Sequence, residues 1–234
     1  MNSELRTPNT KKGLFIMLEG TDGSGKTTQT ELLLNKLKAE GHDVEQISFP
    51  QYGEKSAALV EDYLNGKFGS AKEVGSQRAS ILFAVDRFAA AGKIRNWIDA
   101  GEIVIANRYV ASNMGHQGGK IENDEERKQY FGWNYDLEYN IMGIPKPDIN
   151  VILHVTPEVS QKLVDKKESR EYLHGKKRDI HEDDLNHLRD AERAYLEIAT
   201  LYPEFKVIEC VEDNEILPPE VIADMIWKEI NTHI

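Results

Sequence analysis

Eight residues near the N-terminus have the types and spacing of a phosphate-binding loop. Residues 20–27, GTDGSGKT, fit the pattern G-x-x-x-x-G-K-[ST]. In that pattern a glycine-rich turn aims backbone N–H groups at phosphate oxygens, and a helix N-terminus adds a positive dipole end. We expect Lys26 to neutralise the β- and γ-phosphates of ATP and the Thr27 hydroxyl to ligate Mg²⁺. The predicted ATP-binding residues are Gly20, Thr21, Asp22, Gly23, Ser24, Gly25, Lys26, Thr27 and Thr28.

A charged segment late in the chain could supply further cations to the same phosphates. Residues 160–178 carry seven Lys or Arg against three Asp or Glu, in a chain whose formal net charge is −11. This local excess predicts a short basic lid at about 168–180 that closes over ATP. Arg170 and Arg178 are its candidates for contacts with the transition state. The alternative interpretation is a charge run that only faces solvent.

The loop needs a strand before it and a helix after it, and the sequence predicts both. The apolar run Leu14–Leu18 is typical of a buried strand, and the stripe of leucines after Lys26 indicates a helix that ends at Gly41. Strands and helices alternate along the rest of the chain. Further strands are predicted at 44–49, 102–106, 149–155 and 206–210, and further helices at 56–64, 76–100, 124–142, from 157, at 182–201 and at 219–232.

This alternation predicts an α/β fold, with a five-stranded, mainly parallel sheet and helices on both faces. Phosphate-loop kinases with a short basic lid have this kind of fold. We find no internal repeat and no long linker, so residues 13–234 are expected to form a single domain. Residues 1–12 are polar and are predicted to be a disordered lead.

The charge balance, the cysteine count and the lengths of the apolar runs argue against several classes of protein. The acidic balance, with a pI near 5.2, argues against binding nucleic acid through a broad basic face. The single cysteine, Cys210, allows no internal disulfide, which fits a reducing compartment. No apolar run reaches the roughly 20 residues that span a bilayer, and the N-terminus lacks the apolar stretch of a secretory signal. We therefore expect a cytoplasmic protein without a membrane partner.

Four segments occur in order and narrow the kind of phosphate-loop protein. They are residues 19–29 (EGTDGSGKTTQ), 49–53 (FPQYG), 82–87 (LFAVDR) and 107–113 (NRYVASN), with His116 and Gln117 beyond the last. Together they resemble the thymidylate kinase family. The resemblance implies transfer of the γ-phosphate of MgATP to dTMP, giving dTDP and ADP, and it implies a homodimer.

The resemblance also implies a role for particular side chains. Phe83 matches an aromatic residue that stacks on thymine, and Arg87 matches an arginine that hydrogen-bonds the pyrimidine edge. Arg108 matches the arginine that clamps the acceptor phosphate, and Asp22 an acid near the acceptor sugar or the metal. The predicted catalytic residues are Lys26, Asp22, Arg108, Arg170 and Arg178, and Thr27 and Asp22 are the predicted metal ligands. The predicted substrate-binding residues are Phe49, Phe83, Arg87, Arg108, Ser112, Asn113, Gln117 and Glu182.

Three positions depart from the family pattern and keep other functions open. Asn107 stands where the family usually has Asp, Gln51 where it often has Arg, and His116 where an aromatic residue often crowds the sugar 2′ position. One alternative is a kinase for another pyrimidine nucleotide or a deoxynucleoside. The other is a weakly active nucleotide-binding homologue.

Overall fold

Five parallel strands form the sheet at the centre of the computed structural model, which describes residues 12–165 and 185–234. The strands are β1 (Leu14–Glu19), β2 (Val44–Ser48), β3 (Ile103–Asn107), β4 (Ile149–His154) and β5 (Phe205–Glu209), in the order β2-β3-β1-β4-β5. All four neighbouring pairs are parallel. The predicted α/β fold class is confirmed, and each strand lies within a residue or so of its predicted range.

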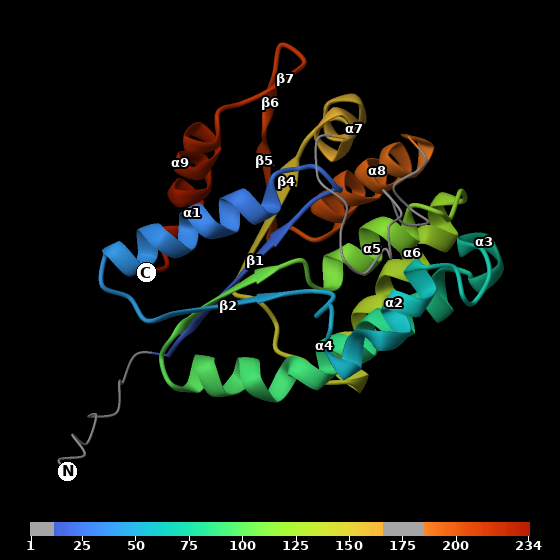
Figure 1. Cartoon of the computed structure of the whole chain (residues 1–234), viewed down its shortest axis with the longest axis horizontal. Helices are drawn as coiled ribbons and strands as arrows, with labels where there is room; N and C mark the ends of the chain where they lie inside the picture. The colour runs from blue at the N-terminus through green and yellow to red at the C-terminus, as the bar shows by residue number, and fades with distance from the viewer. Residues whose placement is uncertain (1–11, 166–184) are drawn as a thin grey trace.

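The helices follow the strands in the alternation that the sequence predicts (Figure 1). They are α1 (Lys26–Ala39), α2 (Ala58–Leu64), α3 (Ala71–Val74), α4 (Ser76–Asp99), α5 (Val110–Gly118), α6 (Asp124–Tyr135), α7 (Pro157–Asp165), α8 (Leu185–Leu201) and α9 (Pro219–Ile230). A 3₁₀ turn, η1 (Lys55–Ala57), precedes α2, and a π-helical segment, η2 (Asp136–Ile141), continues α6. A small hairpin of β6 (Val211–Glu212) and β7 (Glu215–Ile216) follows β5.

The sheet is buried on both faces because helices cover each side. Successive side chains of a strand point to opposite faces, so Phe15 and Met17 join one core while Ile16 and Leu18 join the other. Helices α4, α5, α6 and α8 complete the first core, and α1 and α9 pack on the second (Figure 1). This two-sided burial explains why the inner strands β1, β3 and β4 are largely apolar, whereas the edge strands β2 and β5 carry exposed polar residues.

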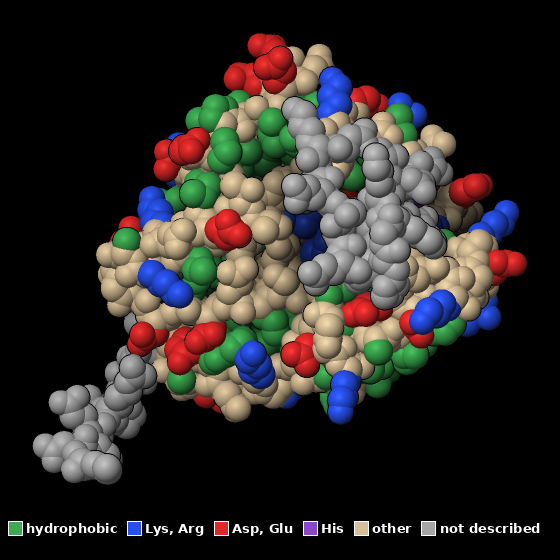
Figure 2. Space-filling model, viewed as in Figure 1, with side chains coloured by type: hydrophobic (Ala, Val, Ile, Leu, Met, Phe, Trp, Pro, Cys, Tyr) green, Lys and Arg blue, Asp and Glu red, His purple; other side chains and the backbone are tan. Residues whose placement is uncertain are grey.

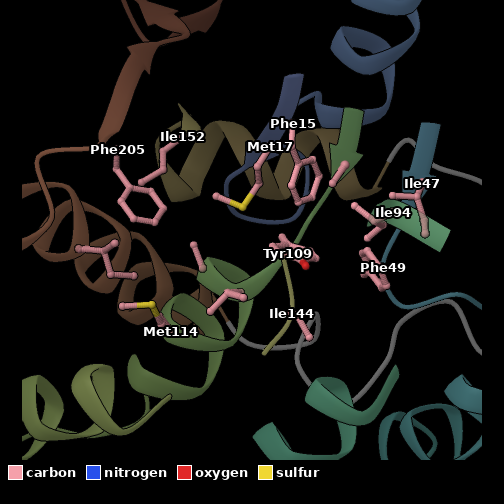
Figure 3. Packing of buried hydrophobic residues seen from close by; sticks show 14 of the residues in the cluster. Phe15, Met17, Ile47, Phe49, Ile94, Tyr109, Met114, Ile144, Ile152 and Phe205 are labelled. Atoms are coloured by element: carbon pink, nitrogen blue, oxygen red, sulfur yellow. The ribbon is translucent and has the colours of Figure 1, made fainter. Parts of the chain in front are cut away.

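The core fixes the segment that carries the predicted phosphate clamp. Tyr109 lies two residues beyond the end of β3 and is fully buried. Its ring centroid lies 5.2 Å from that of Phe15 and 5.6 Å from that of Phe49. Figure 3 shows these three rings in the cluster of buried residues. Its hydroxyl donates to the carbonyl of Pro145 at 3.0 Å. The neighbouring Arg108 therefore leaves the sheet from a rigidly packed position.

One predicted helix differs from the structure, and α3, α5 and the β6–β7 hairpin were not predicted. The helix predicted at 124–142 ends at Tyr135 and continues as the π-helical segment η2, which the apolar periodicity could not show because aromatic residues run through both parts. Helix α5 was not predicted as an element. It is only nine residues long, and eight of them are buried, including the polar Asn113, His116 and Gln117. In the sequence these polar types resemble a solvent-exposed loop, so the segment gave no sign of a packed helix.

Several sequence predictions fall outside the described residues. These are the polar lead up to residue 11, the basic lid at about 168–180, and the candidate residues Arg170, Arg178 and Glu182. Among the helices that are described, none has the length and apolar character needed to cross a membrane.

Candidate functional site

The phosphate loop lies at the carboxyl edge of the parallel sheet, between the end of β1 and the first residue of α1. Gly23 has a φ of +83°, and a Cβ there would lie 2.4 Å from the carbonyl oxygen of Ser160, so only glycine fits. Lys26 is nearly buried, and its Nζ donates to the carbonyls of Gly20 at 3.0 Å and Thr21 at 2.7 Å. The ammonium is thus held inside the loop, where a bound phosphate would replace the carbonyl oxygens as its partner.

A buried carboxylate connects the loop to the helices on one side of the sheet. Glu19, the last residue of β1, is fully buried. Its Oε1 accepts hydrogen bonds from the backbone N–H of Tyr109 at 2.6 Å and of Ser112 at 2.9 Å. Its Oε2 accepts from the Ser112 hydroxyl at 2.6 Å and the Tyr195 hydroxyl at 3.0 Å. One side chain thereby holds β1, the start of α5 and α8 together.

Arg108 lies against the phosphate loop. Its φ of +67° turns the chain sharply between β3 and α5. The guanidinium forms an ion pair with Asp22 and donates to the Gly20 carbonyl at 3.4 Å and the Ser112 hydroxyl at 3.3 Å. Burial alone would lower the pKa of Arg108, but the charge of Asp22 outweighs it and the pKa is raised. A permanent cation therefore stands beside the phosphate loop.

His116 is a neutral partner of this cation. Burial, reinforced by the charge of Arg108, holds the pKa of His116 well below its usual value. Its Nε2 lies 3.0 Å from Arg108 Nη1, which can only donate, so Nε2 accepts and the proton sits on Nδ1. That nitrogen faces Nε2 of His187, on α8, at 3.3 Å. The imidazole thus connects Arg108 to the first turn of α8.

A second buried ion pair lies deeper, between α4 and η2. The Arg87 side chain is 2% exposed, and its Nε and Nη2 donate to the two carboxylate oxygens of Glu138 at 2.5 and 2.8 Å. Asn113 Nδ2 donates to the carbonyl of Ser80 at 3.1 Å and to Glu138 Oε1 at 3.0 Å. Two residues that the sequence predicts to bind the substrate, Arg87 and Asn113, are therefore brought together by a third that it did not identify.

The other predicted residues take different places around the site. Phe83 is partly buried and lies edge-on to Tyr63, with ring centroids 6.1 Å apart. Gln117 accepts a hydrogen bond from Lys120 at 2.6 Å through Oε1. Phe49 is buried in the core against Tyr109, so its ring packs rather than lining an open surface.

Gln51, which replaces an arginine of the family pattern, is tied to α4. Its backbone N–H donates to Asp86 Oδ2 at 2.8 Å, and its Nε2 donates to Asp86 Oδ1 at 3.0 Å. The Ser56 hydroxyl donates to the same Oδ1 at 2.6 Å. Asp86 therefore supports the loop after β2.

Sequence reasoning missed Glu138, Ser80, Tyr195 and His187. Only Glu138 gave a signal, as an acid among the aromatic residues of the segment 130–139. Such a carboxylate is costly to bury and is expected to have a cationic partner. Ser80 contributes a backbone carbonyl and Tyr195 a buried hydroxyl, and neither residue type marks such a role in a sequence.

Few side-chain oxygen atoms near the loop could act as metal ligands, although oxygen is the ligand that a hard cation such as Mg²⁺ prefers. Thr27 is the second residue of α1, and its hydroxyl lies 3.5 Å from Asn107 Nδ2. Asp22, the carboxylate predicted to ligate the metal, forms an ion pair with Arg108. Within residues 12–165 and 185–234, no group of three or more His, Cys, Asp or Glu side chains could hold a metal ion. Mg²⁺ would fit here in its usual manner, with one or two protein oxygens, water and substrate phosphates.

The surface around the loop is mixed in charge. On the face shown in Figure 2, the basic side chains of the described residues are scattered among acidic ones. A broad basic surface, which binding to a nucleic-acid backbone requires, is not seen among the described residues on this face.

Comparison with known proteins places the chain in a family. A family model described as thymidylate kinase matches residues 18–217. A thymidylate kinase of Mycobacterium tuberculosis (strain CDC 1551 / Oshkosh) is 32% identical over 187 residues, which cover 80% of this chain and 86% of the relative. A thymidylate kinase of Bifidobacterium longum (strain NCC 2705) is 30% identical over 216 residues, covering 91% and 97%.

A solved structure supports the same fold. The thymidylate kinase from Candida albicans superposes with a TM-score of 0.72 at 22% sequence identity, covering 96% of this chain and 93% of that chain. At this identity the likeness concerns the fold, and it agrees with the sheet and the helices described above.

The Glu19 network predicts a stability effect. In Glu19→Gln one carboxylate oxygen becomes an NH₂ group that faces buried donors, so we expect the free energy of unfolding to fall by about 2–4 kcal/mol. Urea denaturation followed by circular dichroism measures the change. Glu40→Gln, at an exposed carboxylate beyond α1, is the matched control and should leave stability within about 0.5 kcal/mol. Equal stability of the two variants would contradict the role of Glu19.

Proposed function

Because the chain belongs to the thymidylate kinase family, we propose that the cluster at the carboxyl edge of its sheet is where the γ-phosphate of ATP passes to dTMP. The chain is a phosphotransferase that uses ATP and dTMP. One observation supports the location above the others: Arg108, the predicted acceptor clamp, contacts Asp22 and Gly20 of the phosphate loop. Donor and acceptor phosphates would therefore meet beside one pair of side chains.

On the donor side, the chain supplies binding and charge. The loop amides and the N-terminus of α1 would bind the phosphates of ATP. Lys26 would exchange its bonds to the Gly20 and Thr21 carbonyls for bonds to phosphate oxygens. Phosphoryl transfer needs alignment and charge neutralisation more than covalent help from the protein, and these groups provide both.

On the acceptor side, Arg108 would bind the phosphate of dTMP. Its guanidinium is already held by Asp22, Ser112 and His116, so little side-chain freedom is lost on binding. Asp22 keeps the arginine aimed at the loop rather than reacting itself. Phe83 would stack on the base, and Arg87 and Asn113 would contact its polar edge. Phe49, Ser112, Gln117 and Glu182 complete the proposed substrate site, with Phe49 acting through packing.

Mg²⁺ bound with ATP would be held by Thr27 and Asp22, and it would neutralise charge on the phosphates. Asn107 faces the Thr27 hydroxyl with its Nδ2, so this position offers no negative charge to the cation. Arg170 and Arg178 of the proposed lid lie outside the described residues. Their support is the local excess of basic residues in the sequence.

We also place the protein in the cytoplasm as a homodimer. The single cysteine, Cys210, is buried, and burial raises its pKa to about 12, so it would persist as an unreactive thiol in a reducing compartment. Ile81, Val85 and Phe88 follow one another on a single face of α4 and are 41, 42 and 55% exposed. An apolar stripe of this kind favours contact with a second copy.

Two substitutions separate the donor side from the acceptor side. Lys26→Ala should lower kcat at least a hundredfold without unfolding the chain, because the phosphates lose their cation.

Arg108→Ala should raise the KM for dTMP at least tenfold while the KM for ATP stays within about threefold. The assay follows ADP release from MgATP with dTMP, dUMP, dCMP, ribothymidine monophosphate and thymidine. Preference for an acceptor other than dTMP would favour the alternative kinase, and ATP binding without turnover would favour a weakly active homologue.

The residue at position 107 is expected to influence the Mg²⁺ concentration that turnover requires. Asn107→Asp places a carboxylate oxygen beside Thr27, so the Mg²⁺ concentration for half-maximal turnover should fall several-fold. Asn107→Ala removes the amide without adding charge and should bring no such gain. If the wild type and both variants need the same Mg²⁺ concentration for half-maximal turnover, the metal does not bind beside residue 107.

The stripe on α4 predicts the oligomeric state. A charge in its centre, Phe88→Glu, should shift the dimer to monomer, because an unpaired charge would be buried in the interface. Size-exclusion chromatography with light scattering measures the mass. Leu201→Glu, at an exposed apolar residue on α8, should leave the mass unchanged. A monomeric wild type would refute the dimer directly.

A further inference from the structure

The amide of Asn113 is held in one orientation by two oxygen atoms that carry no hydrogen. One side-chain atom of Asn113 lies 3.1 Å from the Ser80 carbonyl oxygen and 3.0 Å from Glu138 Oε1. A carbonyl and an arginine-paired carboxylate can only accept, so this atom must be the nitrogen. Both hydrogens of Nδ2 are then used. The remaining polar atom, Oδ1, has no hydrogen-bond partner among the described residues and can only accept.

The same carboxylate also holds Arg87, but it leaves Arg87 with a hydrogen-bond donor, whereas Asn113 is left with an acceptor. Glu138 occupies the Nε and Nη2 edge of the guanidinium. Burial opposes the charge of Arg87, but the charge of Glu138 outweighs burial and raises its pKa, so the group stays a donor. Its Nη1, for which no partner is found within the described residues, can only donate. Arg87 Nη2 and Asn113 Nδ2 both donate to Glu138 Oε1, so the two side chains meet at one oxygen atom.

A neighbouring donor and acceptor can distinguish pyrimidines. Thymine and uracil present a carbonyl acceptor at O4 beside a donor at N3–H. Cytosine presents the reverse, an amino donor at N4 beside an acceptor at N3. Arg87 Nη1 and Asn113 Oδ1 match the first pattern and oppose the second. A buried polar group left without its partner makes such discrimination strong.

We propose that Glu138 is a specificity-determining positioning residue, which selects 4-oxo over 4-amino pyrimidines by fixing the Asn113 amide with its oxygen toward the base. It does not touch the substrate and acts through Asn113 and Arg87. Asn134 adds a third donor to Glu138 Oε1 at 3.2 Å, so the carboxylate itself is fixed in place. This inference rests on the proposed function, which places the base of dTMP against these two residues.

The test compares acceptors in Glu138→Gln. A glutamine at this position turns an NH₂ group either to Arg87 Nε or to the three donors at Oε1, and it carries no charge to hold Arg87. The shared support of Arg87 and Asn113 is therefore weakened. We expect the ratio of kcat/KM for dTMP to that for dCMP to fall at least tenfold. The value for dUMP should follow that for dTMP, because the two bases share the same edge, and the KM for ATP should stay within about twofold.

The control residue is Glu197, a carboxylate that pairs with a buried arginine elsewhere in the chain. Arg127 is buried and donates to Glu197 Oε2 at 2.6 Å, and it also pairs with Asp124. Glu197→Gln disturbs a similar ion pair but contacts neither Arg87 nor Asn113 within the described residues, so the acceptor ratio should not change. In an Asn113→Ala background, Glu138→Gln should add little to the change in the ratio, because the amide through which it acts is absent.

The outcomes separate this inference from the proposed function. A wild type that does not phosphorylate dTMP overturns both. A wild type that prefers dTMP, with an unchanged ratio in folded Glu138→Gln or an equal fall in Glu197→Gln, overturns the inference alone. If Glu138→Gln does not fold, Glu138→Asp decides: it keeps the charge beside Arg87 but draws the carboxylate back from Asn113, and an unchanged ratio there also overturns the proposal.

Discussion

The hydrogen bonds of Glu19 join the phosphate loop to the acceptor side of the site. A carboxylate that is fully buried at the end of a central strand must have its oxygens satisfied, and four donors do so here. Two of these donors, the N–H groups of Tyr109 and Ser112, bracket the turn from β3 into α5. The position of Arg108 therefore depends on β1, the same strand that leads into the phosphate loop. In the proposed site, donor and acceptor phosphates would share this support.

Ion pairs hold Arg87 and Arg108 in place, one fully buried and one partly buried, and they serve geometry more than stability. Removing two charges from water costs free energy that their mutual attraction only partly returns. Arg87 and Arg108 nevertheless carry such pairs, with Glu138 and Asp22. In each case the carboxylate occupies part of a guanidinium and leaves another part as a donor. A cation fixed in this way needs little rearrangement when an anionic or polar ligand arrives.

The sequence predicted what local patterns encode, and it missed what long-range contacts create. The loop at Gly20–Thr27 and the five strands follow from motif and apolar runs, and the structure confirms the strands. Helix α5 was missed because it is short and buries polar residues whose types are typical of an exposed loop. Glu138 escaped because its partners, Arg87 and Asn113, lie 51 and 25 residues away in the chain. Contacts at such separations depend on the packing of α4, α5 and η2, which no local pattern reports.

The same packing explains how a site can read a base with very few side chains. An isolated asparagine offers both a donor and an acceptor, so it discriminates poorly until something fixes its amide. The Ser80 carbonyl, on α4, and Glu138, on η2, consume both hydrogens of Asn113 and leave only its oxygen. The π-helical form of η2 is therefore consistent with a functional demand, because irregular helical turns are frequent at sites where a side chain must be placed off the regular period. Selectivity would then reside in the orientation of one amide, and the residue that sets it need not contact the substrate.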